Sequence, residues 1–173
     1  MTAYLAAALV LAFPALVITA ALRDAVSYTI PNWISLALLG IFPLAALALG
    51  LPLPQLGLHA GIGFLALLAG MAMFALGWIG GGDAKLFAAA ALWLGWPALP
   101  AFLLVTCVAG GALAMMLLSL RSVWLRPLVM GGPGWLNRLA HPGENVPYGV
   151  AICAGGLAAF PASPLSGALH VFA

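Results

Sequence analysis

Two aspartates, Asp24 and Asp83, are the only Asp residues in a chain of 173 residues, and Glu144 is its only Glu. The remainder is strongly apolar, with 66% hydrophobic residues, 5% charged residues and a mean hydropathy of +1.22. An ionisable side chain at a membrane is costly and is a functional-site hypothesis by default. Two carboxyl groups held together in a site of low polarity share one proton, which is the catalytic arrangement of aspartic proteases. The chemistry open to this chain therefore depends on whether Asp24 and Asp83 can meet.

Asp83 follows three consecutive glycines, Gly80, Gly81 and Gly82, and precedes Lys85 by two residues. Glycines carry no side chain, so this run predicts a turn at which a peptide backbone could approach Asp83 closely. The alternative is that Asp83 only caps the helix that follows, a common role of Asp. Lys85 could stabilise the ionised form of Asp83, meet an acidic residue of a substrate, or serve as a charge that anchors the helix at the membrane surface.

Asp24 lies between Arg23 and the start of an apolar stretch at Pro31. We expect a short polar loop here, with Asp24 just past the end of the first helix. Taken alone, this loop could hold a simple local pair of Asp24 with Arg23.

Pro147, Tyr148 and Gly149 open the last apolar stretch and are further candidates for shaping a site. The alternative is that they only begin a helix. Glu144 lies just before them and is expected to be a solvated loop acid.

The composition excludes an ordinary soluble domain, in which about 25% of residues are charged. At about 20 residues for each membrane-spanning helix, the chain can hold roughly five to seven spans. We predict an all-α polytopic membrane protein, one integral-membrane domain over residues 1–173. Its six apolar stretches cover residues 2–22, 31–50, 56–79, 84–96, 99–120 and 147–160. The break between the fourth and fifth stretches rests on Pro97 and Pro100, because proline disfavours helical geometry in the residue before it.

Charge placement supports six spans. All five basic residues then fall on one face of the membrane: Arg23, Lys85, Arg121, Arg126 and Arg138. The positive-inside rule makes that face cytoplasmic and places both termini on the outer, periplasmic side. All three acids lie on the same face, so Asp24 and Asp83 are predicted at the same depth. Residues 121–146 form the one sizeable cytoplasmic loop.

Other kinds of site have little support. Cys107 and Cys153 form no CxxC pair, and His59, His141 and His170 show no metal-ligand spacing, so we expect neither a metal nor a cofactor. The net charge of +2 and the absence of a basic run predict no nucleic-acid partner.

The motifs together resemble the type IV prepilin peptidase family. The matching segments are Asp24, residues 30–32 (Ile-Pro-Asn), residues 80–86 (Gly-Gly-Gly-Asp-Ala-Lys-Leu) and residues 147–149 (Pro-Tyr-Gly). Gly-x-Gly-Asp alone also occurs in presenilin-like proteases, but no Pro-Ala-Leu motif follows a late apolar stretch here. The resemblance covers nearly the whole chain.

This resemblance implies an intramembrane-type aspartic endopeptidase with Asp24 and Asp83 as the catalytic pair. The implied substrate is a prepilin with a short basic leader and a hydrophobic helix, cut at the cytoplasmic face of the bacterial inner membrane. Larger family members carry a cytoplasmic insertion with paired cysteines and also methylate the new N-terminus. The chain lacks that insertion and any CxxC pair and looks like the small, peptidase-only branch of Flp (tight-adherence) pili, so methyltransferase activity is not expected. Pilus assembly proteins are possible partners.

Two other functions are open on the sequence. A small transporter could use Asp24 and Asp83 as a proton relay, although relay acids usually lie well inside the hydrocarbon. A structural membrane subunit would need neither aspartate for activity, so replacement of each by Asn separates it from a peptidase.

Overall fold

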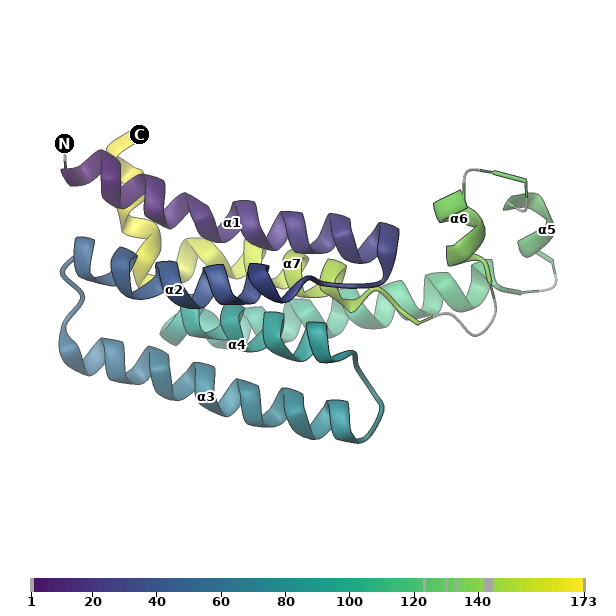
Figure 1. Cartoon of the computed structure of the whole chain (residues 1–173), viewed down its shortest axis with the longest axis horizontal. Coiled ribbons are helices and arrows are strands. Elements are labelled where there is room, and N and C mark those ends of the chain that lie inside the picture. The colour runs from purple at the N-terminus through teal and green to yellow at the C-terminus, as the bar shows by residue number, and fades with distance from the viewer. Residues whose placement is uncertain (1, 123, 130, 133, 142–144, 173) are drawn as a thin grey trace.

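The computed structural model describes residues 2–122, 124–129, 131–132, 134–141 and 145–172, and these contain helices and no strands. The longer helices lie side by side in Figure 1, and a shorter one packs among them. The helices are α1 (Thr2–Ser27), α2 (Asn32–Ala48), α3 (Leu53–Ala75), α4 (Gly81–Leu120), α5 (Arg126–Val129), α6 (Gly134–Leu139) and α7 (Tyr148–Ala159). Two 3₁₀ segments, η1 (Phe160–Ala162) and η2 (Pro164–Phe172), follow α7.

Helix α1 is longer than the apolar stretch that predicts it. It continues to Ser27, whose hydroxyl donates to the carbonyl of Arg23 at 2.7 Å. The expected polar loop at Asp24 is therefore wrong, and Asp24 lies inside the last turns of α1. Polar residues do not by themselves end a helix. The chain leaves the helical path at Tyr28, which adopts the left-handed conformation with φ 54°, and Pro31 then begins α2 as its N-cap.

Helix α4 consists of two helices joined at a sharp reversal. Gly95 (φ 58°) and Trp96 (ψ 135°) are not helical. Residues 15 positions apart in a straight helix lie about 22 Å apart, yet the rings of Phe87 and Phe102 stack with centroids 5.3 Å apart. The second part therefore folds back against the first, as Figure 1 shows. This break lies where the prolines predict one, between the fourth and fifth apolar stretches.

Two buried polar side chains satisfy the backbone carbonyls that the reversal exposes. Pro97 has no N–H, so it cannot donate to the carbonyl of Trp93 four residues earlier. Ser163 donates to that carbonyl at 3.0 Å, and the Nδ1 of His59 lies 2.7 Å from the carbonyl of Leu92. A buried carbonyl without a donor costs about 1–3 kcal/mol. His59 thus has a structural role at the break.

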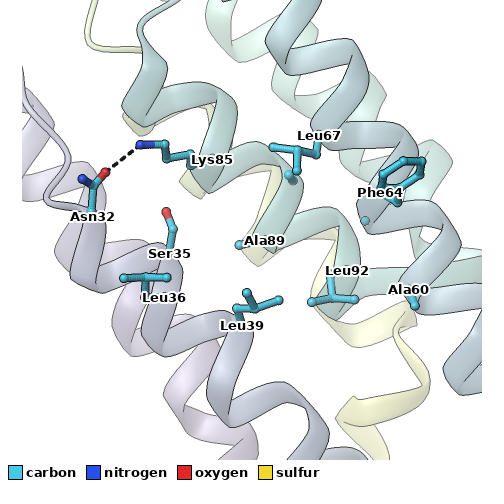
Figure 2. Close-up of a pocket in the computed structure, with 12 residues that line it drawn as sticks. Asn32, Ser35, Leu36, Leu39, Ala60, Phe64, Leu67, Lys85, Ala89 and Leu92 are labelled. Carbon is cyan, nitrogen blue, oxygen red and sulfur yellow. Dashed lines mark hydrogen bonds between the residues drawn. The ribbon is translucent and has the colours of Figure 1, made fainter.

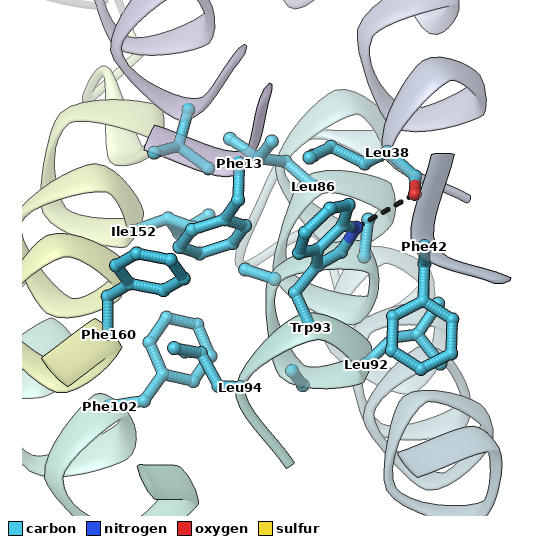
Figure 3. Packing of buried hydrophobic residues seen from close by; sticks show 14 of the residues in the cluster. Phe13, Leu38, Phe42, Leu86, Leu92, Trp93, Leu94, Phe102, Ile152 and Phe160 are labelled. Carbon is cyan, nitrogen blue, oxygen red and sulfur yellow. Dashed lines mark hydrogen bonds between the residues drawn. The ribbon is translucent and has the colours of Figure 1, made fainter. Parts of the chain in front are cut away.

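An aromatic cluster fills the core beside the break. Trp93 is fully buried, stacks on Phe13 at 5.6 Å and meets the edge of Phe42 at 5.9 Å. Its indole N–H donates to the carbonyl of Leu38 at 2.8 Å, so its one polar atom is satisfied. Phe160 stacks on the other side of Phe13 at 5.1 Å (Figure 3). This cluster ties α1, α2, α4 and η1 together.

Three helices are long and apolar enough to cross a membrane: Tyr4–Ser27, Leu53–Ala75 and Gly81–Leu120. Two shorter apolar segments, Asn32–Ala48 and Tyr148–Ala162, lie among them. Large apolar side chains such as Leu36 and Phe64 are more than half exposed, as expected where lipid is the solvent. The fold is that of a polytopic helical membrane protein.

Candidate active site

Asp24 and Asp83 come together at one end of the helical bundle. Asp24 lies near the C-terminal end of α1 and Asp83 in the first turn of α4, and their exposed fractions are only 4% and 8%. Both line a cavity of about 500 Å³, and their charges interact. Two residues 59 positions apart in sequence thus form one pair of buried carboxyl groups. Two carboxyl groups whose charges interact disfavour double ionisation, and such a pair can share one proton.

Gly149 fixes the orientation of Asp24. The backbone N–H of Gly149 donates to Asp24 Oδ2 at 2.7 Å. A Cβ on Gly149 would lie 2.9 Å from that oxygen, 3.0 Å from the Cβ of Asp24 and 3.0 Å from the side chain of Ile30. Any larger residue would therefore push Asp24 out of place. The sequence points to Pro147-Tyr148-Gly149, and the structure supplies a reason for its glycine.

Asp83 is held by the backbone at the start of its own helix. It occupies the third position of α4, and its Oδ2 accepts a hydrogen bond from the N–H of Gly80 at 3.0 Å. Asp83 thus has the capping role that the sequence suggests as an alternative. Capping uses one carboxyl oxygen only. Asp83 Oδ1 is buried, and no well-formed hydrogen bond reaches it within the described chain, although the Gly149 amide also faces this carboxyl.

The three glycines before Asp83 are not equivalent. A Cβ on Gly80 would lie 2.9 Å from Asp83 Oδ2, and a Cβ on Gly82 would lie 3.1 Å from the side chain of Ile30. A Cβ on Gly81 would meet only Phe74, at an ordinary contact distance of 3.5 Å. The expected flexible turn is also displaced, because Gly81 and Gly82 are already helical and Gly80 is the N-cap. The site therefore requires Gly80 and Gly82 for their small size more than for their flexibility.

Aromatic side chains and the end of the long loop line the rest of the cavity. The sequence does not single out most of these residues. Tyr148 is an expected site residue, whereas Tyr28 directly follows α1, Phe74 lies near the end of α3, and no motif marks either of them. The cavity is lined by Asp24, Tyr28, Phe74, Gly77, Trp78, Ile79, Gly80, Asp83, Asn145, Val146 and Tyr148.

Lys85 lies on a different side of α4 from this cavity. Its Nζ donates to the side-chain oxygen of Asn32 at 2.9 Å (Figure 2). No ion pair joins Lys85 to Asp83, or Arg23 to Asp24, in the described part of the chain, and Arg23 is exposed while Asp24 is buried. A local Arg23–Asp24 pair therefore does not account for Asp24. Asn32 belongs to the Ile-Pro-Asn segment, but the sequence does not reveal its contact with Lys85.

The loop between α4 and α7 folds back to the end of α4. Arg121 donates to the carbonyls of Leu139 and Asn145, both at 3.0 Å. The second bond holds Asn145, which lines the cavity. Glu144 lies outside the described residues.

No group of three or more His, Cys, Asp or Glu side chains that could hold a metal ion occurs within the described ranges. Cys107 and Cys153 are unpaired thiols there, the first exposed and the second buried.

A sequence model of the type IV leader peptidase family matches residues 11–115, which is more than half of the chain. The matched segment includes both aspartates and the glycine run, whereas Gly149 lies beyond it. Searches of curated proteins and of solved structures find no match.

Proposed function

The chain belongs to the type IV leader peptidase family, and on that premise we propose that it is an aspartic endopeptidase that removes the leader from type IV prepilins. The observation that carries this proposal is the pair of buried carboxyl groups, Asp24 and Asp83, which come from different helices and face one cavity. A membrane protein without such chemistry has no evident reason to bury its only two aspartates together.

The proposed reaction needs one water and one shared proton. The ionised carboxyl of the pair removes a proton from water, and the water oxygen forms a bond to the scissile carbonyl carbon. The protonated carboxyl donates its proton to the carbonyl oxygen, which gives a tetrahedral intermediate. The intermediate then breaks its C–N bond, and the leaving amine takes up a proton. Because the pair titrates as a unit, neither aspartate is assigned permanently as the acid or the base.

Backbone donors prepare the two carboxyls for this chemistry. Gly149 holds one oxygen of Asp24, and Gly80 holds one oxygen of Asp83. Each bond restricts the rotation of its carboxyl group, so less ordering is required when substrate binds. Asp83 Oδ1 remains available to a water molecule or to the scissile carbonyl. The mechanism uses no metal or cofactor.

The distribution of charge supports an orientation in the membrane. Arg23 and Lys85 lie next to the aspartates in sequence, and Arg121, Arg126 and Arg138 lie at or beyond the C-terminal end of α4. Figure 1 places the start of α1 and the yellow segment η2 together at the opposite end of the bundle. By the positive-inside rule, the site faces the cytoplasm, both termini lie outside, and the chain crosses the bacterial inner membrane six times. Residues 121–146 are then cytoplasmic.

We assign the substrate to the Flp (tight-adherence) class of prepilins, each with a short basic leader and an apolar helix. The support is the resemblance to the small branch of the family, together with the lack of any CxxC pair in the sequence. Methylation of the new N-terminus is not part of the proposal. Pilus assembly proteins remain proposed partners, and the bilayer is the medium.

A proton-relay transporter fits the geometry less well. Relay acids line a path through the hydrocarbon, whereas both aspartates lie near helix ends and line a single cavity.

The test is replacement of each aspartate in the full chain. Asp24→Asn and Asp83→Asn should each lower prepilin cleavage by at least about 10³-fold, because neither amide can exchange the proton that the pair shares. The measurement is the conversion of an Flp-type prepilin to its mature length in membrane vesicles, with the accumulation of each variant as the control. Normal cleavage by either variant, at normal accumulation, would overturn the proposal.

A further inference from the structure

A second cavity lies on the membrane-facing side of the bundle, apart from the carboxyl pair. It is an open groove of about 540 Å³ between α2 and α3, floored by the first part of α4 (Figure 2). Both α2 and α3 pack on α4, but they make little contact with each other. We call it the α2–α3 groove. Its lining residues are Asn32, Ser35, Leu36, Leu39, Ala60, Gly63, Phe64, Leu67, Lys85, Ala88, Ala89 and Leu92.

The polarity of the groove changes along its length. Most of it is apolar, with exposed Leu36 on one wall and exposed Phe64 on the other. The end nearest the carboxyl pair is polar, because Lys85 and Asn32 meet there. Lys85 is exposed and has three donor hydrogens, of which the bond to Asn32 uses one. An occupant therefore needs a long apolar part and an oxygen acceptor at the end near Asp83.

The position of Lys85 places this end at the depth of the site, on the other side of α4. Lys85 follows Asp83 by two residues on α4, which is a rise of about 3 Å along the helix axis. A chain that leaves the groove must pass around α4, which is about 10 Å across, and at about 3.3 Å for each extended residue this path takes roughly five residues. The polar end of the groove and the carboxyl pair thus lie at one depth.

We infer that the α2–α3 groove binds the apolar helix of the prepilin, an inference that rests on the proposed function. Lys85 and Asn32 would hold a backbone or side-chain oxygen of the prepilin at the point where its chain passes from that helix to the cut site. The floor favours a helix over a lipid chain as occupant. Ala88 and Ala89 on α4 and Ala60 on α3 are small, and small residues let helix backbones approach closely in membranes.

The first test is a kinetic comparison of two substrates. Ala60→Trp fills the groove from an exposed position and should raise the KM for a complete Flp-type prepilin by about tenfold. Cleavage of a short peptide that carries the leader and cut site without the apolar helix should change by less than about twofold. The matched control is Ala69→Trp, which lies on the exposed part of α3 outside the groove and should leave both substrates unaffected. Equal loss with both substrates would overturn the inference.

The second test does not depend on cleavage. A photo-crosslinking residue is placed at Phe64 or, as control, at its neighbour Leu65 in the Asp83→Asn chain, in vesicles with the same prepilin. The two positions share a depth and are 60% and 66% exposed, but only Phe64 lines the groove. Crosslinks to the prepilin's apolar helix should form from Phe64 at least about fivefold more than from Leu65, given their roughly 100° separation around the helix.

These tests separate the two proposals. Crosslinking from Phe64 without cleavage by the native chain would support the groove and overturn the peptidase. Cleavage by the native chain without selective crosslinking, or with crosslinks only to lipid or to a second copy, would overturn the groove alone.

Discussion

The bundle buries polar groups in two regions, near its two ends, and the regions differ in how these groups are hydrogen-bonded and packed. At the reversal of α4, His59 Nδ1 and Ser163 pair with carbonyls that the break leaves free, and an aromatic cluster packs around them. His59 Nε2 is buried without a hydrogen-bond partner among the described residues, but tight packing surrounds it. At the carboxyl pair, backbone N–H groups hold only part of each side chain, and a cavity of about 500 Å³ remains in front of Asp24 and Asp83. Buried polar groups that are paired and packed support a fold, whereas those left facing open space are free for chemistry.

The comparison suggests different outcomes for substitutions in the two regions. Changes at the site should reduce activity with little loss of stability. Changes at the reversal should reduce stability with little loss of activity.

Apart from replacement of the aspartates themselves, the largest effect is expected at Gly149. Gly149→Ala places a methyl group 2.9 Å from Asp24 Oδ2 and 3.0 Å from its Cβ, so the carboxyl must move. A displacement of about 1 Å can cost about 100-fold in rate, and we expect at least that loss in kcat/KM for prepilin cleavage. The midpoint of thermal unfolding in detergent should change little, because the added methyl group favours the helix by about 1 kcal/mol and offsets part of the strain. Retention of full activity would show that the bond from Gly149 does not position Asp24.

A smaller effect should distinguish the glycines before Asp83. Gly80→Ala crowds Asp83 Oδ2 at 2.9 Å but touches no other part of the site closely, so we expect about a tenfold loss in kcat/KM as the carboxyl rotates away. Gly81→Ala meets only Phe74 at 3.5 Å and should stay within about twofold of the native rate. Both rates are measured on the same prepilin. Equal losses in the two variants would mean that the run is needed for flexibility and not for space.

The smallest effect on activity is expected at the reversal. Ser163→Ala leaves the buried carbonyl of Trp93 without its donor and should lower the free energy of unfolding by about 1–3 kcal/mol, with cleavage within about twofold of native under stabilising conditions. Ser119→Ala is the control, because Ser119 bonds to Met115 on an exposed surface of α4 and its loss should be within about 0.5 kcal/mol. A large loss of cleavage with no loss of stability at Ser163 would contradict the division between the two regions.

Much of the organisation was accessible from the sequence because hydropathy and proline act locally. The apolar stretches correspond to helices, and Pro97 marks the region where α4 reverses. The family assignment is confirmed by the match over residues 11–115. The boundary at residue 22 was wrong, since hydropathy records the end of the apolar stretch while the helix itself continues to Ser27.

The details of the site depended on contacts between distant segments, which no local pattern encodes. The Gly149 N–H meets a carboxyl 125 residues earlier, and Lys85 bonds to Asn32 across 53 residues. The sequence likewise indicates nothing about the α2–α3 groove. The groove exists because α2 and α3 both pack on α4 and make little contact with each other.

The sequence by itself determined that this chain is a helical membrane protein with two scarce aspartates. The reason is that the apolar composition and the cost of burying a charge are the same whatever tertiary fold the chain adopts. Only the tertiary structure decided that a backbone N–H holds one oxygen of each aspartate and that Asp83 Oδ1 has no hydrogen-bond partner among the described residues. It also decided why Gly80, Gly82 and Gly149 must be small while Gly81 need not be. The physical reason is steric: the space beside each Cα depends on which side chain the fold places there.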